Sequence, residues 1–208
     1  MKRLPNGAFL LEKSRGANGY VVASGEQLAL IDPGMAGGAS GVIAELRDAG
    51  MLGAVRDVLL THYDVDHAGA AMAVAAAAGA SLWITRLDAQ VLTGQVRPAT
   101  VFRRLSTSFG KPRLPGTVSY IGESAGFPTG VEAVPAPGHT PGHVAFRWQE
   151  SLFCGDAALV RRDGSLRQFP GFIITDKPLA LRTAAALEAL DVDWVCPGHG
   201  RPTRKLRS

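Results

Sequence analysis

The segment from Thr61 to Gly69, which reads Thr-His-Tyr-Asp-Val-Asp-His-Ala-Gly, constrains this chain more than any other feature. It places four cation-binding side chains, His62, Asp64, Asp66 and His67, within six residues. In an extended loop, side chains two residues apart point to the same side, so His62 and Asp64 can reach one point. Asp66 and His67 lie where the chain enters the next helix and can reach a second point nearby. Without a cation these groups would repel one another or leave charge buried, so the segment predicts a metal site.

The simpler alternative is a polar loop in which Asp66 caps the following helix. The remaining histidines, His139, His143 and His199, argue against it, because each lies beside a β-like run in a loop rich in glycine or proline. Asp156 follows a further apolar run and Asp32 follows another. Imidazole nitrogens and carboxylate oxygens are typical ligands of divalent cations. Five such segments, each at a strand end, together predict a metal centre.

Apolar runs and turn signals predict two halves with a similar order of strands and helices. We expect strands over 19–24, 27–32, 56–61, 81–85, 117–121, 131–135, 143–148, 152–154 and 192–196. We expect helices over 40–49, 70–78, 87–92, 100–109 and 179–190. Gly25-Glu26 indicates a hairpin between the first two strands, and Ser40 is the expected cap of the first helix. Two such halves predict a four-layer α/β sandwich, with two sheets face to face, in one domain over residues 1–208.

Composition narrows the class of protein. No apolar run approaches the roughly 20 residues of a membrane-spanning helix, and no signal-peptide pattern follows Met1. We therefore expect a cytoplasmic protein with no membrane partner. The two cysteines, Cys154 and Cys196, lie in apolar runs, which favours reduced core residues on neighbouring strands over a metal-binding or redox pair.

The formal net charge of +4 is concentrated in two basic stretches, 97–113 and 201–207. Such residues usually form a solvated surface, although a basic patch can also bind nucleic acid. Only Phe102 and Phe109 interleave the first stretch. We therefore do not expect nucleic acid to be a partner.

In this order and combination, the segments resemble those of the metallo-β-lactamase superfamily, and the resemblance extends from Asp32 to His199. It implies the four-layer αβ/βα fold and a two-metal site. The implied ligands are His62, Asp64 and His139 for a first ion, Asp66, His67 and His199 for a second, and Asp156 as a bridge between them. The resemblance also implies that Asp32 supports the site by hydrogen bonds and that Asp66 takes and returns a proton as the catalytic residue. We expect His143 to be a further supporting residue.

Asp64 departs from the family pattern, which usually has histidine at that position. Two divalent ions, three carboxylates and one hydroxide give the site no net formal charge. With histidine in place of Asp64, the same site would carry one net positive charge. Hard oxygen donors suit iron or manganese better than a histidine-rich site does. We therefore expect two divalent ions, zinc first and iron or manganese as alternatives, with a first site that is weaker for zinc or more tolerant of other metals.

The expected function is hydrolysis of a small-molecule ester, thioester or lactone by a metal-bound hydroxide. The pocket walls are expected within 86–115 and 161–172, with Arg167, Phe169 and Phe172 as candidate lining residues. The chain ends soon after His199, so we expect none of the C-terminal helical domain with which glyoxalase II enzymes bind glutathione. An iron-dependent persulfide dioxygenase and a non-catalytic metal-binding module are the alternatives. The oligomeric state is open, a dimer included.

Overall fold

The first sheet has seven strands. The computed structural model describes residues 1–101, 103–105, 114 and 118–206. The strands lie in chain order: β1 (Lys2–Arg3), β2 (Phe9–Leu10), β3 (Tyr20–Ser24), β4 (Gln27–Ile31), β5 (Val55–Leu59), β6 (Ser81–Ile84) and β7 (Ser119–Tyr120). β3 and β4 form the predicted hairpin, in which Gly25 has a φ of +60°, a value that glycine adopts readily. From β4 to β7 neighbouring strands are parallel.

The second sheet has five strands in the order β14 (Thr203–Arg204), β13 (Trp194–Pro197), β10 (Ser151–Gly155), β9 (Val144–Trp148) and β8 (Val131–Pro135). β10 and β13 are parallel, and the other pairs are antiparallel. β11 (Leu159–Val160) and β12 (Leu166–Arg167) form a separate hairpin. Cys154 and Cys196 are buried and free on the adjacent strands β10 and β13, which confirms that they are core residues on neighbouring strands.

The helices are α1 (Ala39–Asp48), α2 (Val65–Ala68), α3 (Ala71–Ala78), α4 (Arg86–Thr93) and α6 (Lys177–Glu188), with 3-10 turns η1 (Ala36–Gly38) and η2 (Leu52–Ala54). α3 is nearly all alanine, the best helix former, and ends at Gly79 in the left-handed conformation. α6 begins at Asp176, whose side chain accepts a hydrogen bond from the Leu179 backbone N–H. The prediction that Ser40 caps the first helix was wrong. Gly38 occupies the N-cap position of α1, and Ser40 lies within the first turn of that helix.

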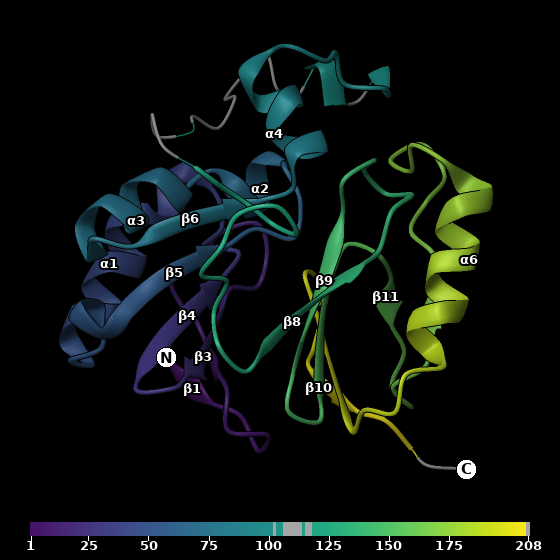
Figure 1. The fold of residues 1–208 in the computed structure, drawn as a ribbon. Helices are drawn as coiled ribbons and strands as arrows, with labels where there is room; N and C mark the ends of the chain where they lie inside the picture. The colour runs from purple at the N-terminus through teal and green to yellow at the C-terminus, as the bar shows by residue number, and fades with distance from the viewer. Residues whose placement is uncertain (102, 106–113, 115–117, 207–208) are drawn as a thin grey trace.

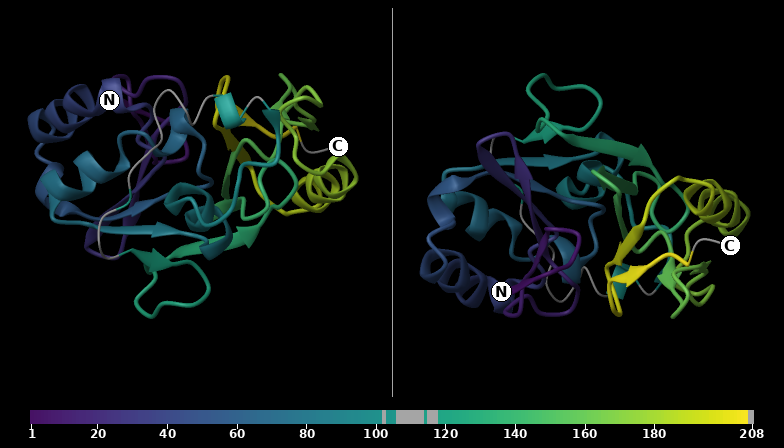
Figure 2. Two further views of the ribbon diagram at one scale, coloured as in Figure 1. Left: turned by 90° about the horizontal axis from the view of Figure 1, so that it is seen from above. Right: turned by 90° about the horizontal axis from the view of Figure 1, so that it is seen from below.

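Three apolar interfaces hold these elements in four layers. α1 and α3 pack on the outer face of the first sheet, where Leu46 and Val74 join Val58 in one cluster. The two sheets meet through a second cluster, in which the rings of Tyr20 and Phe153 are 5.0 Å apart. In a third cluster, a leucine of α6 packs with side chains of β10 and β13 on the far side of the second sheet. Figures 1 and 2 show the resulting order of helices, sheet, sheet and helix, which confirms the predicted sandwich.

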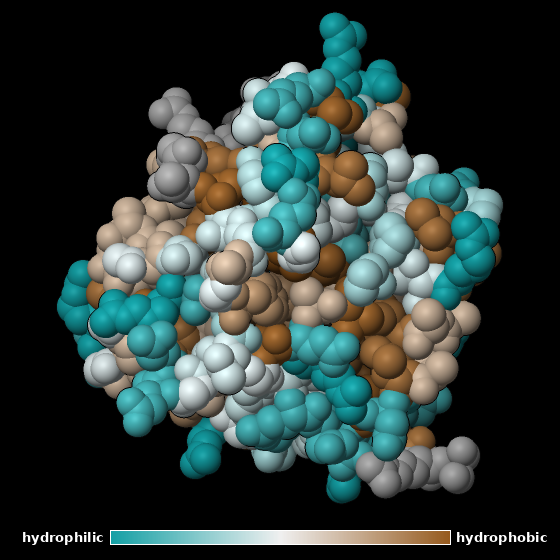
Figure 3. Space-filling view, in the orientation of Figure 1, coloured by the Kyte–Doolittle hydropathy of each residue, from teal (hydrophilic) through white to brown (hydrophobic). Residues whose placement is uncertain are grey.

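Most predicted elements agree with the structure to within two or three residues at each end. The short strands β1, β2, β11, β12 and β14 were not predicted. Part of the predicted helix 100–109 lies outside the described residues, although Val101 and Arg103–Leu105 are helical. No helix in the described part of the chain has the length and apolar character to span a membrane. On the face in Figure 3, hydrophobic residues form separate patches among hydrophilic ones.

Candidate metal centre

Loops from both sheets meet at one edge of the sandwich. Asp32 follows β4, His62 lies just beyond β5, His139 follows β8, Asp156 follows β10 and His199 follows β13. β4 and β5 are parallel neighbours, as are β10 and β13, so the carboxyl ends of each pair lie side by side. The topology therefore brings together residues that are far apart in the sequence, beside α2 in Figure 1.

The first predicted ligand set lies on one side of the centre. His62, Asp64 and His139 each offer an atom within 4.8 Å of the others. His62 Nε2 is 3.4 Å from Asp64 Oδ2, and His139 Nε2 is 3.2 Å from the same oxygen. Thr61 Oγ1 donates to Asp32 and therefore accepts from His62 Nδ1 at 3.0 Å. This tautomer leaves the lone pair of His62 Nε2 facing the centre.

The second predicted set lies on α2 and the loop after β13. Asp66, His67 and His199 again offer atoms within 4.8 Å of one another. His199 Nε2 is 3.2 Å from Asp66 Oδ2, and His67 Nε2 is 3.9 Å from that oxygen. Asp66 is in the first turn of α2 and makes no capping hydrogen bond, because the N-cap position belongs to Asp64. The alternative interpretation of Asp66 as a helix cap was therefore wrong.

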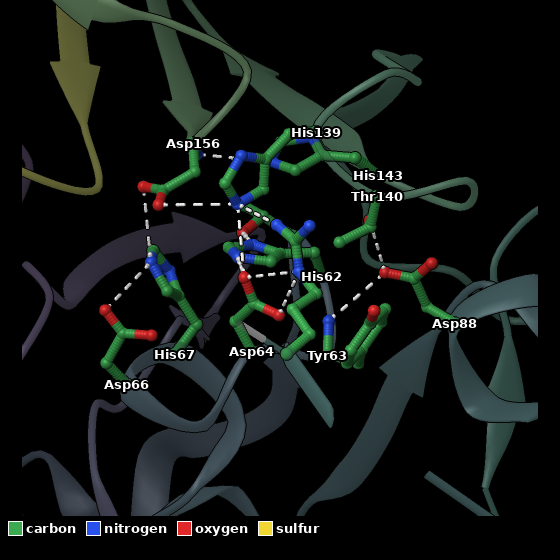
Figure 4. Close-up of polar contacts among 12 residues, drawn as sticks. His62, Tyr63, Asp64, Asp66, His67, Asp88, His139, Thr140, His143 and Asp156 are labelled. Atoms are coloured by element: carbon green, nitrogen blue, oxygen red, sulfur yellow. Dashed lines mark hydrogen bonds and ion pairs between the residues drawn. The ribbon is translucent and has the colours of Figure 1, made fainter. Parts of the chain in front are cut away.

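Asp156 contacts both sets, and in Figure 4 dashed lines lead from it toward His67 and toward His139. Its Oδ1 is 3.3 Å from His67 Nε2, and its Oδ2 is 3.6 Å from His139 Nε2 and 3.4 Å from His199 Nε2. His62 Nε2, His67 Nε2 and Asp156 Oδ1 are buried atoms that have no hydrogen-bond partner. Buried polar atoms are rarely left unpaired, and nitrogen and carboxylate donors facing a common point fit a divalent cation.

Asp32 and His143 support the centre from behind. Asp32 accepts hydrogen bonds from the Thr61 backbone N–H at 2.9 Å and from His67 Nδ1 at 2.8 Å. Because His67 donates through Nδ1, Nε2 is the nitrogen that faces Asp156 and that would bind a metal ion once it has lost its proton. His143 Nε2 accepts the backbone N–H of Asp156 at 3.1 Å, and its ring stacks on His62. Both residues thus orient side chains of the predicted ligand sets.

The electrostatics of the centre favour a positive charge within it. Hydrogen bonds to Asp156 and Asp66 raise the pKa of His199 to about 9. Burial acts to raise the pKa of Asp156, but the neighbouring positive charge of His67 and the approach of His199 hold that pKa well below its usual range. Ionised carboxylates therefore remain buried here and attract protons or cations.

Two glycines allow the close approach of these loops. A Cβ on Gly198 would lie 2.5 Å from both Asp156 Oδ1 and His67 Cε1. A Cβ on Gly155, where φ is +49°, would lie 2.6 Å from Thr61 Oγ1. Only a residue without a side chain fits at either position without a shift of the neighbouring groups.

Arg103 was not predicted as a site residue, because it falls in a basic stretch that was expected to form a solvated surface. Arg103 is fully buried. Its Nε is 2.8 and 3.0 Å from the two carboxylate oxygens of Asp64, and its Nη2 is 2.8 Å from His139 Nε2. No periodicity or motif distinguishes this arginine from its exposed neighbour Arg104, so no sequence signal marked it.

Asp88 on α4 was also missed. Its carboxylate is fully buried and accepts hydrogen bonds from the Gly142 N–H at 2.7 Å, Thr140 Oγ1 at 2.7 Å and the Tyr63 N–H at 3.2 Å. It therefore ties α4 to the loop that carries His139 and to the backbone between His62 and Asp64, as Figure 4 shows. Burial raises its pKa to about 6.

A cavity of about 350 Å³ opens over the centre. Phe169, Phe172 and Ile173 form its apolar wall, and Asp64, Asp66, His139, Asp156 and His199 line its polar side. The predicted lining residues Phe169 and Phe172 are thus in place, whereas Arg167 is not among the residues that line the cavity. Phe172 is 67% exposed at its rim.

Comparisons of the sequence identify relatives. A family model described as the metallo-beta-lactamase superfamily matches residues 14–199. An uncharacterized protein of Bacillus subtilis (strain 168), YobT, is 27% identical over 91% of this chain and 87% of its own length. A hydroxyacylglutathione hydrolase of Shewanella baltica (strain OS223) is 28% identical over 62% of this chain. A probable metallo-hydrolase of Mycobacterium tuberculosis (strain ATCC 25618 / H37Rv), Rv2300c, is 35% identical over 50% of this chain. The matched segments cover only 42% and 37% of those last two proteins.

Solved structures of metallo-beta-lactamase-fold proteins resemble this chain. TTHA1623, crystallised in a di-iron-bound form, is 28% identical, with a TM-score of 0.70 over 94% of this chain and 93% of its own. BLEG-1, described as a B3 metallo-beta-lactamase, is 22% identical, with a TM-score of 0.72 over 95% of this chain and 93% of its own. At that identity the second likeness concerns the fold alone.

Proposed function

The chain belongs to the metallo-beta-lactamase superfamily, and from this premise we propose that it is a metal-dependent hydrolase of a small ester, thioester or lactone. One observation carries the proposal. His67, His199, Asp66 and Asp156, from α2 and two separate strand ends, converge beneath a cavity with an apolar wall. Two of the donor atoms, His67 Nε2 and Asp156 Oδ1, lack any other hydrogen-bond partner.

The residues of the second set, with Asp156, have the donor types and mutual approach that suit a divalent ion, and we propose that they hold it. A divalent cation bound there supplies an acidified water and polarises a carbonyl oxygen. The first set has suitable donor types as well, but Arg103 already contacts Asp64 and His139. We propose that the protein keeps His62 oriented through Thr61 and keeps His67 oriented through Asp32.

Asp66 is the proposed proton carrier. Its carboxylate lines the cavity and is part-exposed, so water and substrate can reach it. Burial acts to raise its pKa, but the hydrogen bond from His199 and the charge of His67 lower it overall. Asp66 is therefore ionised at neutral pH and can accept a proton from the attacking water and return it to the leaving group.

The cavity supports an acyl substrate. Phe169, Phe172 and Ile173 offer apolar contact to a hydrocarbon part, while the polar side meets the carbonyl group. About 350 Å³ suits a small molecule better than a polymer. Two of the relatives are named as hydrolases of hydroxyacylglutathione, which is also an acyl compound.

We expect removal of metal to abolish hydrolysis and its return to restore it. Protein treated with a chelator should lose activity on the ester, thioester or lactone that wild type turns over, and added Zn²⁺, Mn²⁺ or Fe²⁺ should restore it. Elemental analysis of the same samples ties activity to metal content. The substrate that wild type turns over is first identified with a panel of esters, thioesters, lactones and a phosphodiester.

Other outcomes of this panel would point elsewhere. Oxygen uptake with a glutathione persulfide, without hydrolysis, would indicate a dioxygenase. Tight metal binding without turnover of any substrate would indicate a non-catalytic module. Turnover that survives complete metal removal would contradict the proposal.

Gly198→Ala should weaken metal binding while leaving most of the fold intact. The added methyl would press on Asp156 and His67, both in the proposed ligand shell. We expect metal affinity to fall roughly ten- to a hundredfold, as when groups that orient metal ligands are altered. Calorimetric titration with Zn²⁺ measures this. Gly53→Ala is the matched control, since a Cβ there meets nothing within 4 Å. Unchanged affinity in Gly198→Ala would contradict the assignment of these two ligands.

A further inference from the structure

The first ligand set already contains a cation. The Arg103 guanidinium is fully buried and reaches both oxygens of Asp64 through Nε, at 2.8 and 3.0 Å. Its other two nitrogens contact His139 Nε2 at 2.8 Å and Thr175 Oγ1 at 3.2 Å. Arg103 therefore lies among these side chains as a positive charge that belongs to the protein.

The guanidinium occupies the nitrogen lone pair that His139 would give to a metal ion and neutralises the carboxylate of Asp64. Arginine has five N–H donors, no acceptor and a charge that persists at all ordinary pH values. His139 Nε2 must therefore accept from Arg103, which requires that nitrogen to be unprotonated. Of the two histidines in the first set, His62 has an Nε2 without a partner, and His139 has an unpartnered Nδ1, which carries the proton of the neutral ring.

The departure at position 64 explains why the arginine can be there. A buried arginine needs an anionic partner, because an unpaired buried charge is very costly. Asp64 supplies that charge with both oxygens, whereas a histidine at the same position would leave Arg103 among three imidazoles. Asp64 and Arg103 thus act as a unit, and neither is tolerated well without the other.

Charge balance also favours one ion. Asp64, Asp66 and Asp156 face the centre, and one divalent ion together with the guanidinium matches these three carboxylates when the bound water is neutral. A second ion would bring two more positive charges next to a buried arginine. Like charges at such short range repel strongly where water is excluded.

We propose that the Arg103 guanidinium takes the place of the first metal ion, so that the chain binds a single divalent ion through Asp66, His67, Asp156 and His199. This inference rests on the proposed metal centre and replaces the expectation of two ions. Arg103 is a positioning residue, which holds Asp64 and His139 at the cavity and keeps a fixed positive charge beside the ion.

The stoichiometry of metal binding tests this directly. Metal-free wild type, titrated with Zn²⁺ in a calorimeter and checked by elemental analysis after desalting, should bind one equivalent per chain. Arg103→Met removes the charge but keeps an unbranched side chain, and it should add a second equivalent. Arg104→Met is the matched control on the same helical turn. Arg104 is exposed and donates to the backbone oxygens of Pro98 and Ala99, away from the centre, so this variant should stay at one equivalent.

Two further variants keep the test decisive if Arg103→Met does not fold, as judged by circular dichroism. Arg103→Lys retains a cation and should bind one equivalent. The double variant Asp64→His with Arg103→Met restores three histidines without a buried charge and should bind two. Loaded with Mn²⁺, wild type should give the electron paramagnetic resonance spectrum of an isolated ion, and the double variant that of a coupled pair.

Two equivalents of similar affinity in wild type would overturn the inference and leave the proposed hydrolase intact. One equivalent in wild type and in every folded variant that lacks the arginine would also overturn it. No binding in any variant would instead contradict the metal centre on which both proposals depend.

Discussion

Replacing Asp156 with alanine is expected to reduce hydrolysis by about three orders of magnitude or more, because the reaction depends on a bound ion that activates water. Asp156 is the residue that both ligand sets share: its oxygens lie 3.3 to 3.6 Å from His67, His139 and His199. Its removal takes away a ligand and leaves the histidines without their common counter-charge. We expect the ion to be lost together with the activity, which elemental analysis and steady-state kinetics on the same preparation would measure.

The polar contacts of the Asp156 side chain are with His67, His139 and His199 of the same centre, and His143 contacts only its backbone. Asp156→Ala should therefore keep its far-ultraviolet circular dichroism spectrum. Asp191→Ala is the control. It removes an exposed carboxylate from the loop between α6 and β13, and it should retain activity and metal. Full activity in Asp156→Ala would show that the reaction does not use this centre.

The convergence of the site could be predicted because it follows from topology. Residues just beyond β4 and β5, such as Asp32 and His62, must lie together when those strands are parallel neighbours. The same holds for Asp156 and His199 after β10 and β13. All seven predicted ligands lie around one point, and Asp32 and His143 lie behind them. That these residues hold a metal remains a prediction.

The fold was predicted where periodicity and breakers agree. The alanine-rich α3 ends at Gly79, and the β3–β4 hairpin turns at Gly25, as expected from the conformations that glycine allows. Short edge strands such as β1 and β14 have two residues each, too few to show alternation. They exist because a neighbouring strand offers backbone hydrogen bonds, which the local sequence does not encode.

Buried charges were beyond the reach of sequence patterns. Arg103 and Asp88 each belong to a helical segment in which charged residues usually face solvent. What makes them buried is the partner across the fold, Asp64 for the first and the loop at Thr140 for the second. Such pairs are separated by tens of residues, and a single sequence carries no record of the pairing.

Asp88→Ala is expected to lower the free energy of unfolding by about 3 kcal/mol or more, because three buried donors lose their acceptor at once. These donors are the N–H groups of Tyr63 and Gly142 and the hydroxyl of Thr140. They belong to the two loops that carry His62, Asp64 and His139, so the loops should loosen and metal affinity should fall as well. Urea unfolding and a Zn²⁺ titration would measure the two effects. Asp57→Ala is the control variant. It removes a half-buried carboxylate that accepts a hydrogen bond from one side chain, Trp83, and it should lower the free energy of unfolding much less.

The pH dependence of the unfolding free energy distinguishes the contribution of the Asp88 charge from that of its hydrogen bonds. Burial raises the pKa of this carboxyl to about 6 from an ordinary value of 3.8. A raised carboxyl pKa means that the folded chain binds this proton more tightly than the unfolded chain, so folding gains stability as pH falls from above 6 toward 4. Asp88→Asn cannot titrate and lacks this gain. The difference in unfolding free energy between wild type and Asp88→Asn should therefore shift in favour of wild type across that window. If the difference in unfolding free energy between the two proteins stays constant from pH 7 to 4, Asp88 keeps its charge throughout this range. The hydrogen bonds that Asp88 accepts would then lower its pKa as much as burial raises it.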